Sequence, residues 1–321
     1  MSVVHKVRDM RKSHWRVLCI VLTSAIASAQ SRAQTDHVVH VRMQNVMYHF
    51  TDRIAVHLRE VNGELAPVSG NDLPVFDDKH SFILQLTDAE IAISTASLAN
   101  VLNTQVFAAK DAPLKDVSIR IEAGRIRVKG KLHNKGDIVF ETEGSLSPTP
   151  DGKMRLHAEK IKALHVPVKG MMDLFGVEIA DLIKTGKLRG IKAEQDDLIL
   201  DPQTLLPAPH IEGKVTAVRL DGDNIVQGFG NPKAQSGPEG LRNYMAYRGN
   251  QLRFGKLTMK DTDMILIDMD PKDPFDFYLD HYQEQLSAGY TKITPSFGLR
   301  VYMRDFNKLK RTTSTRRRPA K

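Results

Sequence analysis

The chain is almost without cysteine and tryptophan. It has 321 residues, with one Cys and one Trp, and both lie near the N-terminus, at Cys19 and Trp15. A single cysteine cannot form an intramolecular disulfide, and it cannot supply the thiolate set of a structural zinc site. The stability of the fold must therefore come from a hydrophobic core, for which a chain of this length is sufficient.

Signatures of common catalytic sites are also missing. No serine lies in a Gly-x-Ser-x-Gly turn, and none of the 12 histidines belongs to a His-Glu-x-x-His motif. The glycine-containing stretch at residues 228–237 lacks the Lys-Ser or Lys-Thr ending of a phosphate-binding loop. The sequence therefore predicts no cofactor and favours a protein that is not an enzyme.

Positive charge is concentrated at the two ends of the chain. The formal net charge is +8, but residues 1–34 carry six Lys or Arg against one Asp, and residues 308–321 carry seven against no acid. In residues 35–307 the 33 Lys and Arg are outnumbered by 37 Asp and Glu, a net charge of −4. A nucleic-acid-binding domain carries its basic charge on folded surface, so we expect no nucleic acid partner.

Residues 1–33 have the order of a secretory signal peptide. A basic stretch at residues 11–16 precedes the apolar segment Val17–Ile26, and small-residue cleavage sites follow before Gln30 and before Gln34. The apolar segment is too short to span a bilayer, and no later stretch approaches the roughly 18 apolar residues of a transmembrane helix. We therefore expect an exported, periplasmic or secreted protein; an uncleaved membrane anchor is the alternative.

Period-2 alternation of apolar and polar residues dominates the rest of the sequence and predicts β-strands. A meander of four antiparallel strands is predicted over residues 117–158, with short turns at Ala123-Gly124 and at Asp151-Gly152. Further strands are predicted at residues 39–43, 54–61, 81–86, 191, 198–200, 215–220, 245–247, 252–259, 265–269 and 299–303. The chain should be rich in β-structure, with one polar face on the meander.

Three segments have helical periodicity instead. Residues 94–107 place Leu98, Val101 and Leu102 on one stripe, and Ser94 or Thr95 can cap the first turn. A second helix is predicted at residues 171–186, where Gly186 is a natural stop. A third is predicted at residues 273–286, with Asp273 as the cap, followed by Pro274.

Composition divides the chain into five parts. A signal peptide at residues 1–33 precedes a β-rich domain at 35–230, and a Gly- and Pro-containing linker follows at 231–240. A smaller strand-helix-strand extension is predicted at 241–307, and a disordered basic tail at 308–321.

The order of these elements resembles the exported LmeA-like phospholipid-binding proteins, which are related in character to tubular lipid-binding and AsmA-like envelope proteins. The resemblance covers about residues 81–230 and rests on a Leu-Asn helix, a glycine-flanked strand and a Gly-Leu…Asp-Gly hairpin. The matching positions are Leu98, Leu102, Asn103; Gly124, Ile126, Val128, Gly130; Gly144, Leu146, Asp151, Gly152, Met154 and Leu156. The resemblance implies an α+β, β-rich fold in which a twisted antiparallel sheet wraps one or two long amphipathic helices.

The resemblance also implies a function, the binding of a lipid or another amphiphile in an apolar groove. Such a groove needs aliphatic side chains rather than catalytic groups, and each buried methylene contributes about 0.8 kcal/mol. The candidates for lining it are Leu98, Val101, Leu102, Ile126, Val128, Phe140, Leu146, Met171, Leu174, Phe175 and Ile179. The alternative is that these side chains only pack helix onto sheet, in a structural envelope protein without a ligand.

Two charged features have other readings. Seven aspartates lie within residues 261–280, and Asp268, Asp270 and Asp273 are weak candidates for a metal site or a metal-assisted hydrolase. Strand flanks and helix capping explain them better, so we predict a structural role. In the basic tail, Arg316, Arg317 and Arg318 are candidates for contact with an anionic membrane surface or an envelope polymer.

Overall fold

The computed structural model of the chain describes residues 38–68, 73–133, 137–164, 172–173, 188–231 and 237–309. The chain divides into the units Met1–Val38 and Val39–Lys321, and the description below concerns the second. Several predicted features lie outside the described residues, namely the signal peptide, Met171, Leu174, Phe175, Ile179, Arg316, Arg317 and Arg318.

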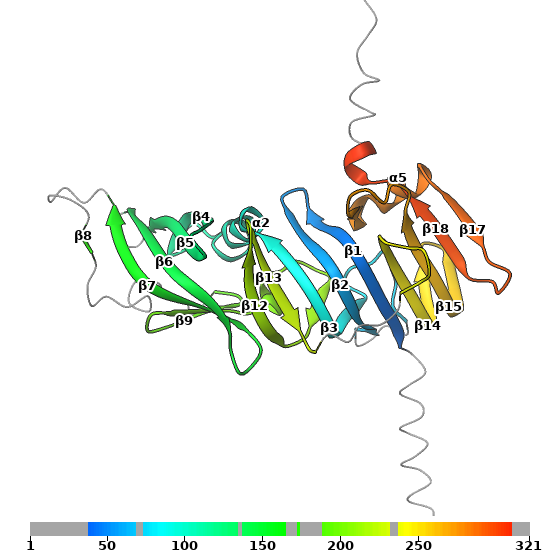
Figure 1. Ribbon diagram of the computed structural model, residues 1–321, viewed down its shortest axis with the longest axis horizontal. Coiled ribbons are helices and arrows are strands. Elements are labelled where there is room, and N and C mark those ends of the chain that lie inside the picture. The colour runs from blue at the N-terminus through cyan, green and yellow to red at the C-terminus, as the bar shows by residue number, and fades with distance from the viewer. Residues whose placement is uncertain are drawn as a thin grey trace, which may run out of the picture. The chain divides into compact units, whose positions relative to one another are not determined.

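The larger of two β-sheets has eleven strands (Figure 1). They are β1 (Val39–Thr51), β2 (Ile54–Pro67), β3 (Phe82–Ser94), β11 (His210–Glu212), β12 (Val215–Asp221), β13 (Asn224–Phe229), β14 (Tyr244–Phe254), β15 (Leu257–Asp268), β16 (Phe275–Tyr278), β17 (Tyr290–Ile293) and β18 (Leu299–Met303). The strand order is β12-β13-β3-β2-β1-β14-β15-β18-β17, with β11 paired to β3 and β16 paired to β1. Three of the pairings, β1 with β16, β3 with β11 and β15 with β18, are parallel, so the sheet is mixed.

The smaller sheet has seven strands in the order β4-β5-β6-β7-β10-β9, with β8 paired to β7. They are β4 (Leu114–Glu122), β5 (Arg125–Leu132), β6 (Ile138–Pro148), β7 (Met154–Leu164), β8 (Met172–Asp173), β9 (Ile191–Glu194) and β10 (Asp197–Leu200). This sheet contains the predicted meander. Ala123 and Gly124 both have positive φ, as a tight two-residue hairpin turn requires, and Gly152 has a φ of 86° in the next turn.

The helices of the described residues are short. They are α2 (Thr95–Val101), its π-helical continuation η1 (Leu102–Val106), α4 (Pro202–Leu205), the 3-10 turn η3 (Leu279–His281) and α5 (Tyr282–Ser287), and residues 306–309 are helical as well. The predicted cap of the first helix is confirmed, because the Ser94 hydroxyl accepts a hydrogen bond from the Ser97 backbone N–H. The β-rich prediction is confirmed, whereas long amphipathic helices are not found among the described residues, and none of these helices is long and apolar enough to cross a membrane.

The prediction of a helix over residues 273–286 is wrong in its first half. Residues 275–278 form β16, which pairs in parallel with residues 46–49 of β1, and helical structure begins only at Leu279. The physical reason is that β14 pairs with β1 only as far as Gln44, which leaves a hydrogen-bonding edge for β16. Of the predicted second helix, Met172 and Asp173 form β8, and the rest lies outside the described residues.

Residues beyond the predicted linker continue the sheet formed by the first strands. Strand β14 pairs antiparallel with β1, and β15 pairs antiparallel with β14. One hydrophobic core contains side chains of both sheets and of α2. The predicted extension at 241–307 therefore shares its sheet and its core with the first three strands.

Candidate functional site

Local irregularities in neighbouring strands change which side chains face the apolar inner side of the large sheet. In β1 the buried positions are odd-numbered up to Met43 and even-numbered from Val46, and between them Asn45 has a φ of 52°. The pairing of β1 with β2 leaves out Asn45 and Arg59 together without a change of register, whereas the pairing of β2 with β3 shifts between Leu58 and Glu60. A bulge inserts one residue and thereby exchanges the two faces of a strand. Both halves of each strand can thus direct apolar side chains to the same side.

An apolar cavity of about 60 Å³ lies against this inner face. Side chains of β1, β2, β3 and β14 line it, and three further segments, which we call the covering segments, complete the lining: residue 76, residues 206–211 and residues 277–279, which include parts of the sheet strands β11 and β16. The lining side chains are Met43, Tyr48, Phe50, Val56, Leu58, Leu65, Phe76, Phe82, Leu84, Ile91, Leu206, Pro209, Ile211, Met245, Tyr247, Phe277 and Leu279. Segments far apart in the sequence therefore meet at one apolar space.

Aromatic rings make up much of the cover. The ring of Phe76 lies 5.6 Å from that of Tyr247 and 6.0 Å from that of Phe277, in edge-on geometry. It also contacts the rings of Phe254 and Tyr282 at 5.0 and 6.1 Å. Residue 76 is held by backbone, since its N–H donates to the carbonyl of Arg253 at the end of β14. The cover on this side is thus a packed aromatic cluster tied to the sheet.

Two tyrosines supply the polar side-chain groups of the cavity lining. Tyr48 and Tyr247 are both buried among the apolar side chains of the lining. Burial, and then the negative charge of Asp280, raises the pKa of Tyr48, and burial raises that of Tyr247. A buried tyrosine hydroxyl normally has a hydrogen-bond partner. These neutral hydroxyls can therefore donate to a polar atom that enters the cavity.

The predicted groove residues lie elsewhere. Those on α2, η1 and the small sheet belong to the core between these elements: Leu98, Val101, Leu102, Ile126, Val128 and Phe140 are buried, and Leu146 is partly buried against them. None of these seven side chains lines the 60 Å³ cavity. Asn103 joins the same region, because its side-chain amide exchanges two hydrogen bonds with the backbone of Val117 on β4.

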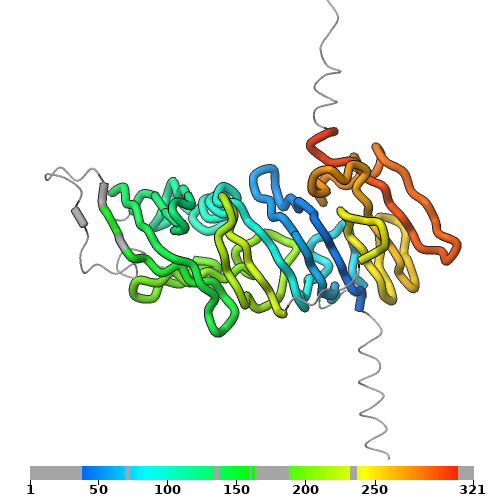
Figure 2. The backbone as a smooth tube through the Cα atoms, viewed as in Figure 1, coloured from blue at the N-terminus to red at the C-terminus, as the bar shows by residue number. Residues whose placement is uncertain are grey.

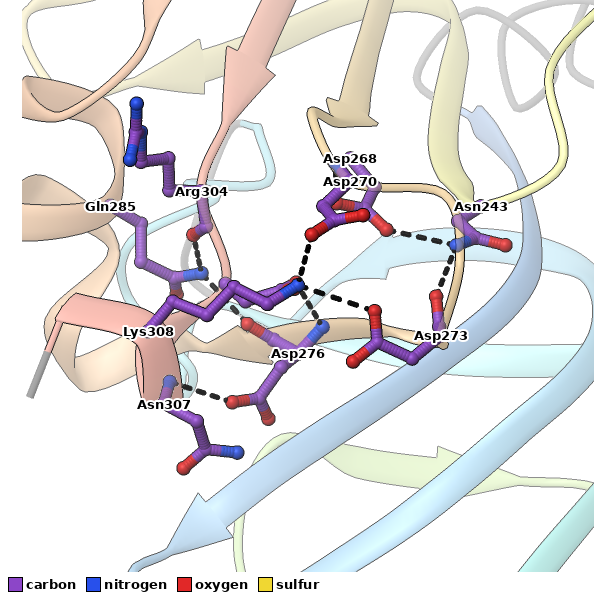
Figure 3. A network of polar contacts seen from close by, with 10 residues as sticks. Asn243, Asp268, Asp270, Asp273, Asp276, Gln285, Arg304, Asn307 and Lys308 are labelled. Atoms are coloured by element: carbon purple, nitrogen blue, oxygen red, sulfur yellow. Dashed lines mark hydrogen bonds and ion pairs between the residues drawn. The ribbon is translucent and has the colours of Figure 1, made fainter. Parts of the chain in front are cut away.

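Four of the seven aspartates of residues 261–280, namely Asp268, Asp270, Asp273 and Asp276, take part in a polar network around Lys308 (Figure 3). The Lys308 ammonium donates to Asp270 at 2.7 Å, to Asp273 at 3.3 Å and to Asp305 at 2.6 Å. Asp268 instead accepts from the Asn243 side-chain amide at 2.8 Å and from the Asp270 backbone N–H at 2.7 Å. Lys308, which we assigned to the basic tail, therefore belongs to the folded part of the chain.

This network fastens β16, which carries Phe277 of the cavity cover, to the end of β18. Asp276 contacts the His49 ring and accepts from the Asn307 backbone N–H. The buried Gln285 side chain donates to the carbonyls of Asp276 and Arg304, and it accepts from the Tyr278 N–H. Each carboxylate thus has a partner from the protein itself, as a structural role requires.

Burial changes the proton affinity of two of these carboxylates. It raises the pKa of Asp268 to about 6, against the hydrogen bond from Asn243, and it raises that of Asp305, against the bond from Lys308. Burial alone would lower the pKa of Lys308, but its hydrogen bonds to Asp270, Asp305 and Asp273 raise it. Within the described residues no group of three or more His, Cys, Asp or Glu side chains is arranged to hold a metal ion.

Sequence reasoning missed the cavity, although it predicted several of the strands that line it. The alternation at residues 39–43, 54–61 and 81–86 predicted strands whose apolar side chains line it. The covering segments gave no comparable signal, since residues 206–211 have no periodicity and residues 275–278 were predicted as helix. The pattern Phe-Asp-Phe in β16 is the one local sign that could have favoured a strand there.

No family model matches this chain, and neither a curated protein nor a solved structure is similar to it.

Proposed function

We propose that this chain binds an amphiphile, with the apolar part in the cavity on the inner face of the large sheet and a polar atom at the tyrosine hydroxyls. The carrying observation is the chemistry of the lining: apolar side chains throughout, with two neutral phenols as its polar side-chain groups. Ligand sites are commonly concave and apolar, with a few polar groups that fix orientation. This chemistry suits binding rather than catalysis.

The size of the cavity sets a condition on this proposal. An engineered dry cavity of roughly 150 Å³ binds benzene, so 60 Å³ is too small for an acyl chain. Binding therefore requires a covering segment to move. Residues 206–209 suit this role because they lie between the four-residue α4 and the three-residue β11 without regular secondary structure. Met43 and Met245 can adapt to a ligand, because methionine side chains fill irregular shapes.

The cellular part of the proposal rests on the sequence. We propose that the chain is exported and that the amphiphile is a lipid of the cell envelope, held or transferred there. The support is the signal-like order of residues 1–33 and the resemblance to LmeA-like lipid-binding proteins. Cleavage before Gln30 or Gln34 would remove Trp15 and Cys19, so N-terminal sequencing of the exported protein tests this part; a mature chain that retains Trp15 contradicts it.

A dansyl-labelled fatty acid tests the cavity directly. The full chain should bind the probe with increased dansyl emission, and the variant Leu58→Trp should abolish binding while it melts near the parent temperature, since the indole occupies the cavity. The matched control is Leu146→Trp on β6, in the predicted groove beside α2, which should leave probe binding unchanged.

The two variants separate the possible outcomes. If Leu146→Trp blocks the probe and Leu58→Trp does not, the ligand lies beside α2, as the sequence first suggested, and the cavity assignment is wrong. If the parent chain binds no probe, the amphiphile proposal itself fails and a structural role takes its place.

A further inference from the structure

The β17–β18 hairpin ends the large sheet and carries an unusual set of exposed side chains. Strand β17 is the last in the strand order, and all four of its residues are exposed. Ile293 is 73% exposed, and Phe297, in the turn between the two strands, is 91% exposed. The backbone trace in Figure 2 shows this orange-to-red hairpin at the edge of the sheet, with its turn directed away from the strand ends that join α5. Its apolar side chains thus project from the fold.

The turn is closed by hydrogen bonds, and its backbone is strained at Phe297. The Phe297 N–H donates to the Thr294 carbonyl at 2.9 Å, and the Gly298 N–H donates to the Thr294 hydroxyl at 2.8 Å. Phe297 has a φ of 62°, a left-handed conformation that an aromatic residue rarely adopts. With 91% of its surface exposed, its ring gains little from packing that could offset this cost. A strained residue that does not serve the core is a reason to look for a partner.

The charge beside this tip is positive, in contrast to the folded body. Residues 290–300 contain Lys292 and Arg300 and no acid, whereas residues 35–307 as a whole have a net charge of −4. The Lys292 ammonium lies 5.4 Å from the Tyr290 ring and 5.6 Å from the Tyr302 ring, and these two rings are stacked at 4.5 Å. Cations and tyrosines next to exposed apolar side chains are typical of segments that lie at a lipid headgroup layer.

The neighbouring turn adds to the same edge. Because β15 and β18 run parallel, the start of β15 and the β17–β18 turn lie towards the same edge of the sheet. There Leu257 is 50% exposed, and the exposed Lys256 and Lys260 flank it. Counted together, residues 256–263 and 290–300 carry four cations and two acids, a net charge of +2. The edge thus pairs exposed apolar side chains with positive charge.

We propose that this hairpin docks the protein on an anionic lipid bilayer, with Phe297 and Ile293 inserted among the headgroups and Lys292 at the phosphates. A protein partner fits less well, because a narrow turn offers far less area than a stable protein interface needs. Pairing of β17 with a second copy is disfavoured by its length of four residues and by its lysine. A bilayer accepts single inserted side chains and attracts the adjacent cations. The proposal does not depend on the cavity.

Vesicle binding by the full chain tests it. Vesicles of phosphatidylcholine with phosphatidylglycerol should sediment the protein, and vesicles of phosphatidylcholine alone should sediment it less. The double variant Ile293→Thr with Phe297→Gly should bind the anionic vesicles about tenfold more weakly, as the loss of partly inserted apolar area predicts. Glycine suits the left-handed conformation at position 297, so this change should not unfold the turn.

A fluorescent reporter locates the contact. In a Trp15→Phe background, Phe297→Trp should shift its emission to the blue with anionic vesicles. The matched control, Met269→Trp, replaces an exposed apolar side chain just beyond the other end of β15 and should not shift. Three results would overturn the proposal: no vesicle binding, binding with unchanged emission at position 297, or a concentration-dependent dimer that the double variant abolishes in the absence of lipid.

Discussion

Two apolar regions of this chain differ in how their side chains meet. Around α2, Leu98, Val101 and Leu102 come from α2 and its continuation η1, which are consecutive in sequence, and pack onto the adjacent small sheet. On the inner face of the large sheet, the apolar side chains come from four strands and three distant covering segments, and a cavity remains between them. Burial by itself, which is similar in both regions, therefore does not distinguish a packed interior from a ligand site.

The two regions also differ in how the segments that pack onto each sheet are held. Around α2 the helix and β4 are close in sequence, and the Asn103 amide fixes one against the other. On the large sheet the cover consists of segments that are held at their own ends, by Arg253 for residue 76 and by the Lys308 network for β16. The space lies where these separately held segments meet the sheet.

Removal of side-chain volume should show the largest difference between the two regions. We expect Leu102→Ala to lower the free energy of unfolding by about 3–4 kcal/mol, as in a filled core. Leu58→Ala should cost about 2 kcal/mol, because part of the Leu58 surface faces the cavity and makes no contacts to lose. Urea unfolding of both variants measures this, and equal costs would argue against a difference in packing.

Larger side chains provide the converse test of packing in the two regions. Val101→Phe in α2 should cost about 2 kcal/mol through overpacking, whereas Val56→Phe, which lines the cavity, should cost less than about 1 kcal/mol. Thermal melting of the two variants at one pH is sufficient. A severe loss of stability in Val56→Phe would show that the cavity cannot accept added atoms, and it would weaken the amphiphile proposal.

The free energy of unfolding should also depend on pH, because the network that holds β16 beside the cavity contains Asp268. Its pKa in the folded state is about 6, above the ordinary value near 4. Between about pH 4 and pH 6 the folded chain holds a proton on Asp268 that the unfolded chain has released. The contribution of Asp268 to the stability of the fold is therefore present below about pH 4 and is lost as the pH rises through about 6. Asp268→Asn removes the titration, and its stability relative to the parent should rise by on the order of 2 kcal/mol between about pH 4 and pH 7.

Asp270→Asn is the matched control for this pH dependence. The hydrogen bond from Lys308 lowers the pKa of Asp270, so this group stabilises the fold above its ordinary pKa and loses that effect in acid. The stability of Asp270→Asn relative to the parent should therefore decrease as the pH rises. This change has the opposite sign to that expected for Asp268→Asn. Urea unfolding at several pH values measures both, and the same sign in both variants would refute the assignment.

The smallest expected change in stability comes from a variant that tests the role of a tyrosine hydroxyl in binding. Tyr48→Phe removes the hydroxyl of a buried side chain and leaves the ring in place, so the free energy of unfolding should change by less than about 1 kcal/mol. Binding of the dansyl fatty acid should weaken if this hydroxyl holds a polar atom of the ligand. A large loss of stability would instead reveal that the hydroxyl already has a structural partner.

Much of the local structure was predictable from the sequence. The alternation over residues 117–132 and the Ala123-Gly124 turn gave the β4–β5 hairpin, and Ser94 gave the start of α2. These features depend on neighbours within a few residues, namely the side-chain period of a strand, the positive φ of a tight turn and the capping hydroxyl. The predicted groove residues among them are buried as their periodicity indicates.

The tertiary structure decided the rest. The sequence by itself determined which residues alternate, where hairpins turn and that residues 94–107 are helical. It did not determine that residues 275–278 form β16, since their partner is the edge of β1 more than 200 residues earlier in the chain. Nor did it determine the cavity or the network around Lys308, because a void or a shared ion pair exists only where separate segments meet, and no local pattern records how well they fit.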